Sequence, residues 1–433
     1  MEEGRVDRPG DASPALGAFR HRDFTIFWST ALISNSASWM QLVAVPALLK
    51  DQTGSNTWVG GAAMASLLPS TLLTPLAGIL ADRMSRRLIL VVTQIVQMAF
   101  AFGFFALHVA DLLTPWRILA LLFGNGVVAG FQIAAWQSFV PTLVPRESLV
   151  DAVRLNSVQF QAARAIGPGV GAVAVGVLGI GAAFFLNAIT YLPVIVAVVL
   201  ARPRQVIVAR SERQKMRADL VEGFRYVWLS VALRRAVVTA FVVSALGQSL
   251  VQLAAGISTD VYGKSSDANA GLVAALGVGS LVTGSWVIGW GGRVRRSSLA
   301  MWGLVGYAFG VLMIAVSTSY VVGLLAFFIC GLSHIPIATS LNTFMQSAVP
   351  DEIRGRVVSC YLLGVMLGMP VGSFGLGRLS DSIGMREVLV LDVIAFGAFV
   401  LVAIFRFGRM RDFDRDTIDD IPGVVRASAA SSA

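Results

Sequence analysis

Long apolar runs, separated by short polar or charged segments, recur along nearly the whole chain. A helix needs about 20 mainly apolar residues to cross the roughly 30 Å hydrocarbon core of a bilayer, and the runs are about this long. The pattern predicts twelve transmembrane helices, at residues 24–49, 58–80, 88–110, 116–139, 156–178, 180–200, 235–257, 268–290, 299–317, 320–345, 358–379 and 385–405.

One connection, residues 201–234, is much longer than the others and divides the predicted helices six and six. Within it, apolar residues recur at helical spacing while basic residues face elsewhere, which predicts an amphipathic helix on the inner leaflet. Its apolar positions are Met216, Leu220, Phe224, Val227 and Trp228. The predicted fold class is therefore an all-α membrane protein whose twelve transmembrane helices form two six-helix halves.

The two halves echo each other in sequence. Val144 to Glu147 after the fourth helix matches Val349 to Glu352 after the tenth. The basic segment Arg293 to Arg296 follows the eighth helix, as the basic segment Arg83 to Arg87 follows the second. Secondary transporters are often built from such repeats. The predicted organisation is a cytoplasmic N-terminal segment (1–23), an N-terminal half (24–200), a cytoplasmic linker (201–234), a C-terminal half (235–405) and an unstructured cytoplasmic tail (406–433).

Basic residues indicate the orientation of the predicted helices. Of 34 Lys and Arg residues, 28 fall in the segments of one face, five fall on the opposite face, and Arg164 lies within a helix. Because short basic loops stay in the cytoplasm, both termini are predicted to be cytoplasmic and the protein to lie in the plasma (inner) membrane. Residues 1–23 contain no apolar core or cleavage site, so no signal peptide is expected.

Composition agrees with a polytopic membrane protein and argues against other classes. Hydrophobic residues make up 56%, charged residues 14%, and the mean hydropathy is +0.74. The net charge of +9 is spread over separate loops, which topology explains better than nucleic-acid binding. Cys330 and Cys360 lie in apolar runs, so we expect packed thiols rather than a disulfide. With three His and no nucleotide motif, neither an enzyme, a cofactor nor a metal site is predicted.

A short charged loop, Gly78 to Arg87, joins the second and third predicted helices. Its functional candidates are Gly78, Asp82, Arg83, Arg86 and Arg87. This pattern resembles the loop between transmembrane helices 2 and 3 of the major facilitator superfamily. Ser85 stands where that family usually has Gly, which predicts a less relaxed turn. The resemblance implies a gate in which Asp82 meets the N-terminus of the eleventh helix; the alternative is a loop that only sets topology.

Polar residues follow one face of the first, fourth, seventh and tenth predicted helices. They are Ser34, Ser38 and Gln41; Asn125, Gln132 and Trp136; Ser244, Gln248 and Gln252; and His334, Asn342 and Met345. Polar groups inside a membrane are costly and usually face a cavity or another helix. In the superfamily that the chain resembles, these four helices line the central cavity, which implies an uncharged substrate site here. Interhelical hydrogen bonding is the alternative.

The fifth predicted helix contains Arg164, Gly167, Pro168 and Gly171, which resemble the Gly-Pro signature of drug exporters in this superfamily. Ala172 replaces the last Gly of that signature. The glycines permit close helix packing and the proline a bend, so the segment is interpreted as a gating hinge or, alternatively, as a packing face. Arg164 either holds an anionic solute group or has a structural partner.

From residue 19 to about 407, the chain resembles the enterobactin-exporter and macrolide-efflux branch of the superfamily. The matching segments are Phe19–Phe24, Ala81–Arg83, Val144–Pro145, Arg164 with Gly167–Pro168, and Glu222–Tyr226. The resemblance implies a monomeric, proton-coupled exporter of a bulky amphipathic solute, such as a siderophore, macrolide or other drug, working by alternating access. The alternatives are an importer of a small organic solute and a non-transporting receptor or scaffold on the same fold.

The sequence leaves the proton-carrying residue unassigned. The first and fourth predicted helices contain no acidic residue, where many proton-coupled exporters of the superfamily have one. His334 is either a titrating group or a hydrogen-bonded packing residue. Asp392 in the twelfth helix is the other ionisable candidate or, alternatively, a structural partner of Arg378 near the outer face.

Overall fold

The computed structural model describes residues 17–83, 85–202, 216–290, 293–406 and 408–414, together with most of their side chains. Within these ranges the ordered elements are helical and none is a strand. Ten helical segments of the described residues are long and apolar enough to cross a membrane. The two remaining predicted spans, 58–80 and 156–178, fall on helices as well, so the chain is an all-α, multi-pass membrane protein.

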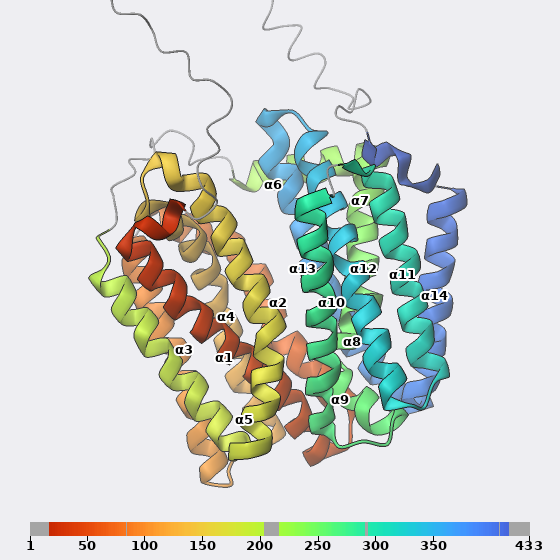
Figure 1. The fold of residues 1–433 in the computed structure, drawn as a ribbon, viewed down its shortest axis with the longest axis horizontal. Helices are drawn as coiled ribbons and strands as arrows, with labels where there is room; N and C mark the ends of the chain where they lie inside the picture. Colours follow the sequence, from red (N-terminus) through yellow and green to blue (C-terminus); the bar gives the residue numbers. More distant parts are fainter. Residues whose placement is uncertain (1–16, 84, 203–215, 291–292, 407, 415–433) are drawn as a thin grey trace, which may run out of the picture.

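The first part of the chain forms one helical bundle (Figure 1). Its helices are α1 (Arg22–Thr53), α2 (Asn56–Arg83), α3 (Arg86–Val109), α4 (Pro115–Phe139) and α5 (Leu149–Leu200). α1 packs along α5, α2 along α4, and α3 against both α4 and α5. α5 is interrupted at Gly179, whose φ of 81° is unfavourable for residues with a Cβ. This break falls between the predicted fifth and sixth spans.

The second part forms another bundle. Its α-helices are α6 (Met216–Leu229), α7 (Val231–Val242), α8 (Ser249–Gln252), α9 (Ala254–Gly256), α10 (Asn269–Trp290), α11 (Arg296–Val316), α12 (Tyr320–Ser347), α13 (Asp351–Ile383) and α14 (Met385–Phe405). The predicted seventh span is not one regular helix, because π-helical η5 (Val243–Gln248) interrupts it and π-helical η6 (Ile257–Val261) begins at its last residue. Close packing accompanies the interruption: a Cβ on Gly247 would lie 2.6 Å from the Tyr307 ring.

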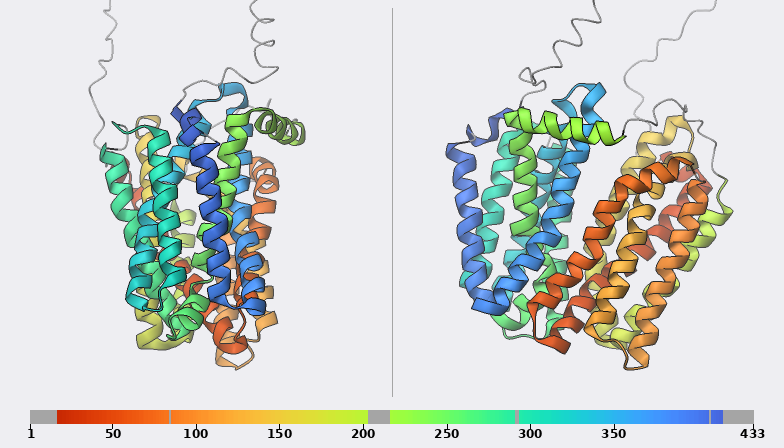
Figure 2. Two further views of the ribbon diagram at one scale, coloured as in Figure 1. Left: turned by 90° about the vertical axis from the view of Figure 1, so that its right-hand side faces the viewer. Right: turned by 180° about the vertical axis from the view of Figure 1, so that it is seen from behind.

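The two bundles stand side by side, with α6 across one end (Figures 1 and 2). The first and last described residues lie at this same end, whereas the α1–α2 connection lies at the other. Contacts between the bundles run chiefly through α2 with α13 and α5 with α10.

Corresponding arginines make corresponding hydrogen bonds in the two bundles. Arg86, at the start of α3, donates from Nη1 to the Ser138 carbonyl near the end of α4, at 3.2 Å. Arg296, at the start of α11, donates from Nη1 to Ser347 Oγ near the end of α12, at 2.9 Å. The structural equivalence supports the internal repeat that the sequence indicated.

Two local expectations differ from the structure. Ser85 has a φ of −62° and caps α3, its Oγ accepting from the Leu88 N–H at 3.4 Å, so no glycine conformation is needed there. The segment predicted as an unstructured tail begins with a 3₁₀ helix, η9 (Gly408–Asp414). Phe413 is fully buried against Phe344, with ring centroids 4.8 Å apart, and this burial anchors η9.

Candidate solute cavity and closure between the bundles

A cavity of about 110 Å³ lies where α1, α2, α4 and α5 of the first bundle meet α8 of the second. Four residues predicted for the substrate site line it: Ser38, Gln41, Asn125 and Gln252. Apolar side chains such as Leu42, Val45 and Leu122 complete the wall. The structure therefore brings together polar residues from three of the four predicted stripes around one uncharged space.

Three further polar residues of this cavity, Ser66, Asn187 and Tyr191, were missed by the sequence analysis. Asn187 Nδ2 donates to Gln41 Oε1 at 2.5 Å, and the Tyr191 hydroxyl lies 3.4 Å from Ser38 Oγ. Both belong to α5 beyond its break. Because Asn187 and Tyr191 are four residues apart, the same polar spacing that singled out the other stripes would have found them.

Predicted residues of the second bundle meet each other beside the cavity. Gln248 Nε2 lies 3.3 Å from His334 Nδ1, joining the seventh and tenth predicted helices. Gln252 Nε2 donates to Met369 Sδ at 3.3 Å. Asn342 is exposed and accepts from Gln346 of its own helix, so it does not line this cavity.

Trp136 and Gln132 do not line the cavity in this conformation. Trp136 is 4% exposed, and its ring centroid lies 4.6 Å from that of Phe27 in the packing of the first bundle. Its indole N–H donates to Asn156 Oδ1 at 3.0 Å. Trp136 thus holds α4 against α1 and α5.

The Gly-Pro segment packs against α1. A Cβ on Gly167 would lie 2.4 Å from Trp39 Cβ, and one on Gly171 would lie 2.9 Å from Met40 Cα. These close approaches account for both glycines through helix packing. The structure does not describe the side chains of Arg164 and Pro168.

The predicted gating loop is described in part. The side chains of Asp82 and Arg83 and the surroundings of Gly78 lie outside the described set. Arg86 holds α3 to α4 within its own bundle, and Arg87 is half-buried.

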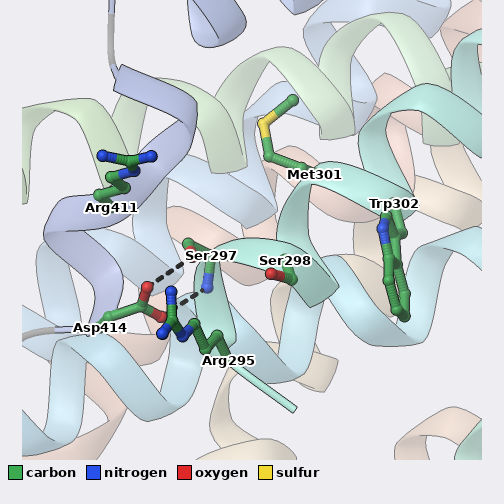
Figure 3. Close-up of a pocket in the computed structure, with 7 residues that line it drawn as sticks. All are labelled: Arg295, Ser297, Ser298, Met301, Trp302, Arg411 and Asp414. Atoms are coloured by element: carbon green, nitrogen blue, oxygen red, sulfur yellow. Dashed lines mark hydrogen bonds between the residues drawn. The ribbon is translucent and has the colours of Figure 1, made fainter.

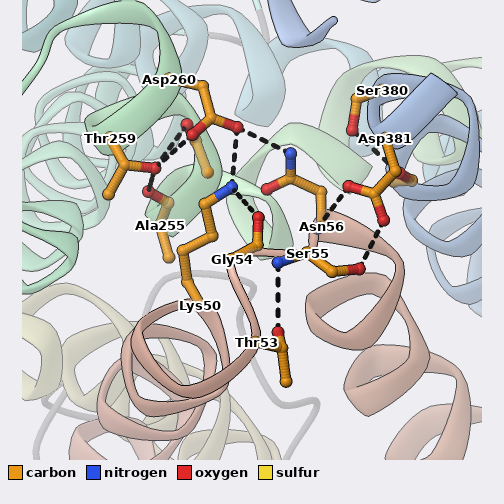
Figure 4. Close-up of polar contacts among 12 residues, drawn as sticks. Lys50, Thr53, Gly54, Ser55, Asn56, Ala255, Thr259, Asp260, Ser380 and Asp381 are labelled. Carbon is orange, nitrogen blue, oxygen red and sulfur yellow. Dashed lines mark hydrogen bonds and ion pairs between the residues drawn. The ribbon is translucent and has the colours of Figure 1, made fainter. Parts of the chain in front are cut away.

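The two bundles are joined by an ion pair at the end opposite α6 (Figure 4). Lys50 Nζ lies 2.8 Å from Asp260 Oδ2 of the second bundle and 2.9 Å from the Gly54 carbonyl. Asn56 Nδ2 donates to the same carboxylate oxygen at 2.8 Å. The Lys50 side chain is only 7% exposed, so its positive charge is stabilised by these partners rather than by water.

A carboxylate of the second bundle caps a helix of the first. Asp381 Oδ1 accepts from the Asn56 N–H at 2.7 Å, and its Oδ2 accepts from the Thr57 N–H at 3.0 Å and from Thr57 Oγ1 at 2.6 Å. These N–H groups form the start of α2, where a helix has unpaired donors and a positive dipole end. Asp381 of α13 supplies the negative charge that satisfies them.

Backbone contacts reinforce this closure. A Cβ on Gly60 of α2 would lie 2.2 Å from the Ser373 carbonyl oxygen of α13. A Cβ on Gly377 of α13 would lie 2.4 Å from the Asn56 carbonyl oxygen. The two helices therefore pack backbone to backbone, and side chains at either glycine would hold them apart.

Tyr262, directly after η6, belongs to the same end. Its ring meets Tyr320 edge-on, with centroids 6.1 Å apart. Burial, and to a smaller extent the nearby Cys330 thiol, raises the pKa of Tyr262 to about 12. The phenol therefore remains neutral at physiological pH, and Lys50, Asp260 and Asp381 supply the charges of the closure.

A larger cavity, of about 480 Å³, has a described lining that comes from α11, the residue before it and η9 (Figure 3). Its polar groups include Arg295, Arg411 and Asp414. Asp414 accepts from the Ser297 N–H at 2.9 Å and from Ser297 Oγ at 2.5 Å, which caps α11. Because all the lining residues that the structure describes belong to one bundle, this space is separate from the contact between the bundles.

Comparison with known proteins gives a family and a fold. The family model described as "Transmembrane secretion effector" matches residues 13–424. The multidrug efflux pump Tap of Mycolicibacterium fortuitum is 24% identical over 406 residues, covering 89% of this chain and 95% of that protein. The enterobactin exporter EntS of Salmonella typhi is 23% identical over 414 residues, covering 90% and 94%.

Among solved structures, a mutant of the nucleoside transporter NupG superposes with a TM-score of 0.75, covering 90% of this chain and all of that one. Its 10% sequence identity makes this a likeness of fold alone. The family match spans nearly the whole chain. The chain therefore belongs to the transmembrane secretion effector family of the major facilitator superfamily, and it is a transporter rather than an enzyme.

Proposed function

We propose that the protein is a proton-coupled exporter of a bulky amphipathic solute, such as a siderophore, macrolide or other drug. It works as a monomer in the plasma membrane, and its twelve spans alternate between two arrangements of their six-helix halves. The observation that carries this proposal is the uncharged polar cavity at the contact between the bundles, next to a closure built from both. Alternating access needs both features.

The lining of the cavity favours an amphipathic solute. Asn187, Gln41 and Ser38 offer hydrogen bonds without a net charge, and apolar residues supply the remaining surface. The relatives named as a multidrug efflux pump and an enterobactin exporter are consistent with large exported compounds. A cavity of about 110 Å³ is too small for a drug-sized ligand, so the bundles must rearrange to admit one.

The position of the closed end determines the side of the membrane toward which the cavity can open in this conformation. If the termini and α6 are cytoplasmic, Lys50, Asp260 and Asp381 close the outer end. The conformation is then the one from which a solute enters the cavity from the cytoplasm. In the opposite state, Asp82 of the charged loop closes the inner end by meeting the N-terminus of α13, with Arg83 and Arg87 bracing the other half.

A panel of dyes and antibiotics tests the proposal in cells that express the protein or an empty vector. Expressing cells should accumulate less of one or more compounds, and a protonophore should abolish the difference. Efflux that persists after the proton gradient collapses would contradict proton coupling. Greater accumulation in expressing cells would indicate an importer, and no solute flux in proteoliposomes would favour a receptor or scaffold.

A further inference from the structure

Asp392 is a carboxylic acid inside the second bundle. It lies two turns into α14 and is 1% exposed. Neither side-chain oxygen has a hydrogen-bond partner among the described residues. The pairing with Arg378 expected from the sequence is not present, since the ion pairs of the described residues do not include these two side chains.

The surroundings favour the protonated form of this acid. An ionised carboxylate is among the costliest groups to bury in a membrane protein, unless a cation or several donors compensate its charge. Asp392 has neither within the described chain. In this conformation the carboxyl therefore carries its proton.

The helices around this part of α14 bring a phenol and a thiol into the neighbourhood of Asp392. Tyr307 of α11 contacts Phe396, one turn further along α14, with ring centroids 5.7 Å apart. The Cys330 thiol of α12 lies close enough to interact electrostatically with the carboxyl. The charged side chains described on the elements packed against α14 stand near the ends of those elements; they are Arg296, Arg354, Arg356, Arg378, Asp381, Asp260, Arg411, Asp412 and Asp414.

A row of polar groups leads from Asp392 toward the solute cavity. Cys330 and His334 are four residues apart and share a face of α12. His334 Nδ1 is 3.3 Å from Gln248 Nε2. Gln252, which lines the cavity, follows four residues after Gln248. These polar residues, spaced one helical turn apart or joined by a hydrogen bond, therefore run from the neighbourhood of Asp392 to the wall of the cavity, although Asp392 itself makes no hydrogen bond to them.

We propose that Asp392 is the site of the coupled proton. It holds the proton while the Lys50–Asp260 end is closed and releases it when solute enters the cavity. The step is the reversible loss of one proton from one carboxyl, and no other bond is made or broken. The inference rests on the proposed function, because it assigns the coupling residue of that transporter.

Asp392→Asn tests the assignment, because Asn resembles the protonated carboxyl in shape and cannot release a proton. The matched control is Glu387→Gln, which makes the same change at an exposed acid in the first turn of α14. Each variant is reconstituted in proteoliposomes with the compound that wild type exports most strongly in the panel. Asp392→Asn should retain transport down a solute gradient and lose both uphill transport driven by a pH gradient and solute-dependent proton release. Glu387→Gln should retain all three.

Two outcomes would overturn the assignment: wild-type proton coupling in Asp392→Asn, or equal loss of coupling in Glu387→Gln. If Asp392→Asn does not fold, infrared difference spectra of the wild type decide instead. Addition of solute should then bleach the carbonyl band of a protonated carboxyl, and an unchanged band would reject the site. Failure of the wild type itself to couple transport to protons would contradict the proposed function, which separates the two results.

Discussion

At the scale of single residues, the candidate side chains of this transporter have three roles: some line the cavity, some close the contact between the bundles, and some pack helices together. The sequence predicted much of the cavity, because a polar residue inside an apolar helix stands out: Ser38, Gln41, Asn125 and Gln252 all line it. It did not predict the closure. Lys50 reads as an ordinary loop cation, and nothing in its neighbourhood indicates a partner 210 residues away.

The Lys50–Asp260 pair should stabilise the closed end. Lys50→Met should weaken this closure by about 2 kcal/mol, the scale of a charged hydrogen bond, because Asp260 loses its cation. The exchange Lys50→Asp with Asp260→Lys should recover part of that loss. Solute flux and the labelling of a Cys at the cavity residue Val45 measure the effect, in a background without Cys330 and Cys360. A swap no better than Lys50→Met alone would show that the charges are not coupled.

Trp136 and Gln41 should respond differently to truncation. Trp136→Ala removes a buried ring beside Phe27 and leaves Asn156 without its donor, so it should cost about 3–5 kcal/mol of stability. Gln41→Ala should cost less stability, since it removes only the hydrogen bond from Asn187, and it should change which compounds are exported, because Gln41 lines the cavity. Thermal unfolding in detergent and the compound panel separate these effects. An altered compound profile at wild-type stability for Trp136→Ala would place its ring in the solute path.

At the scale of helices, hydrophobic run length predicted positions well because the bilayer sets the length of a span. Even the break between the fifth and sixth spans was found, at Gly179. The π-helical interruption of the seventh span could not be read from the sequence, since it accompanies contacts with distant residues, such as that of Gly247 with Tyr307. η9 was missed for the same reason: Phe413 is ordered by α12, not by its own neighbours.

Gly60 should be required for α2 and α13 to close on each other. Gly60→Ala places a methyl group 2.2 Å from the Ser373 carbonyl oxygen, which forces the helices apart. Gly61→Ala is the matched control, since its methyl group would lie 3.9 Å from Leu119 Cδ2, an ordinary contact. Gly60→Ala should lower transport and increase labelling of a Cys at Val45 from the closed end, at unchanged membrane abundance. Equal behaviour of the two alanine variants would contradict a closure role for this contact.

At the scale of the whole molecule, the distribution of charge and the arrangement of helices support one topology. α6 lies across the end of the bundle where both described chain ends are found, so all three belong to one membrane face. Phe224 and Trp228 of α6 are stacked and more than half exposed, as expected of aromatic side chains at a membrane interface. Residues 201–234 contain eight Lys and Arg residues, and such a segment resists translocation.

Cysteine labelling can establish which face this is. With Cys330 and Cys360 replaced by Ala, a Cys at Ser211 in the linker should resist an impermeant thiol reagent in intact cells and react once the membrane is permeabilised. A Cys at Thr318, in the exposed α11–α12 connection, should react in intact cells and serves as the outer-face control. If the Cys at Ser211 reacts and the Cys at Thr318 does not, the molecule is inverted. The Lys50–Asp260 end would then be cytoplasmic, and the cavity of this conformation would open toward the outside.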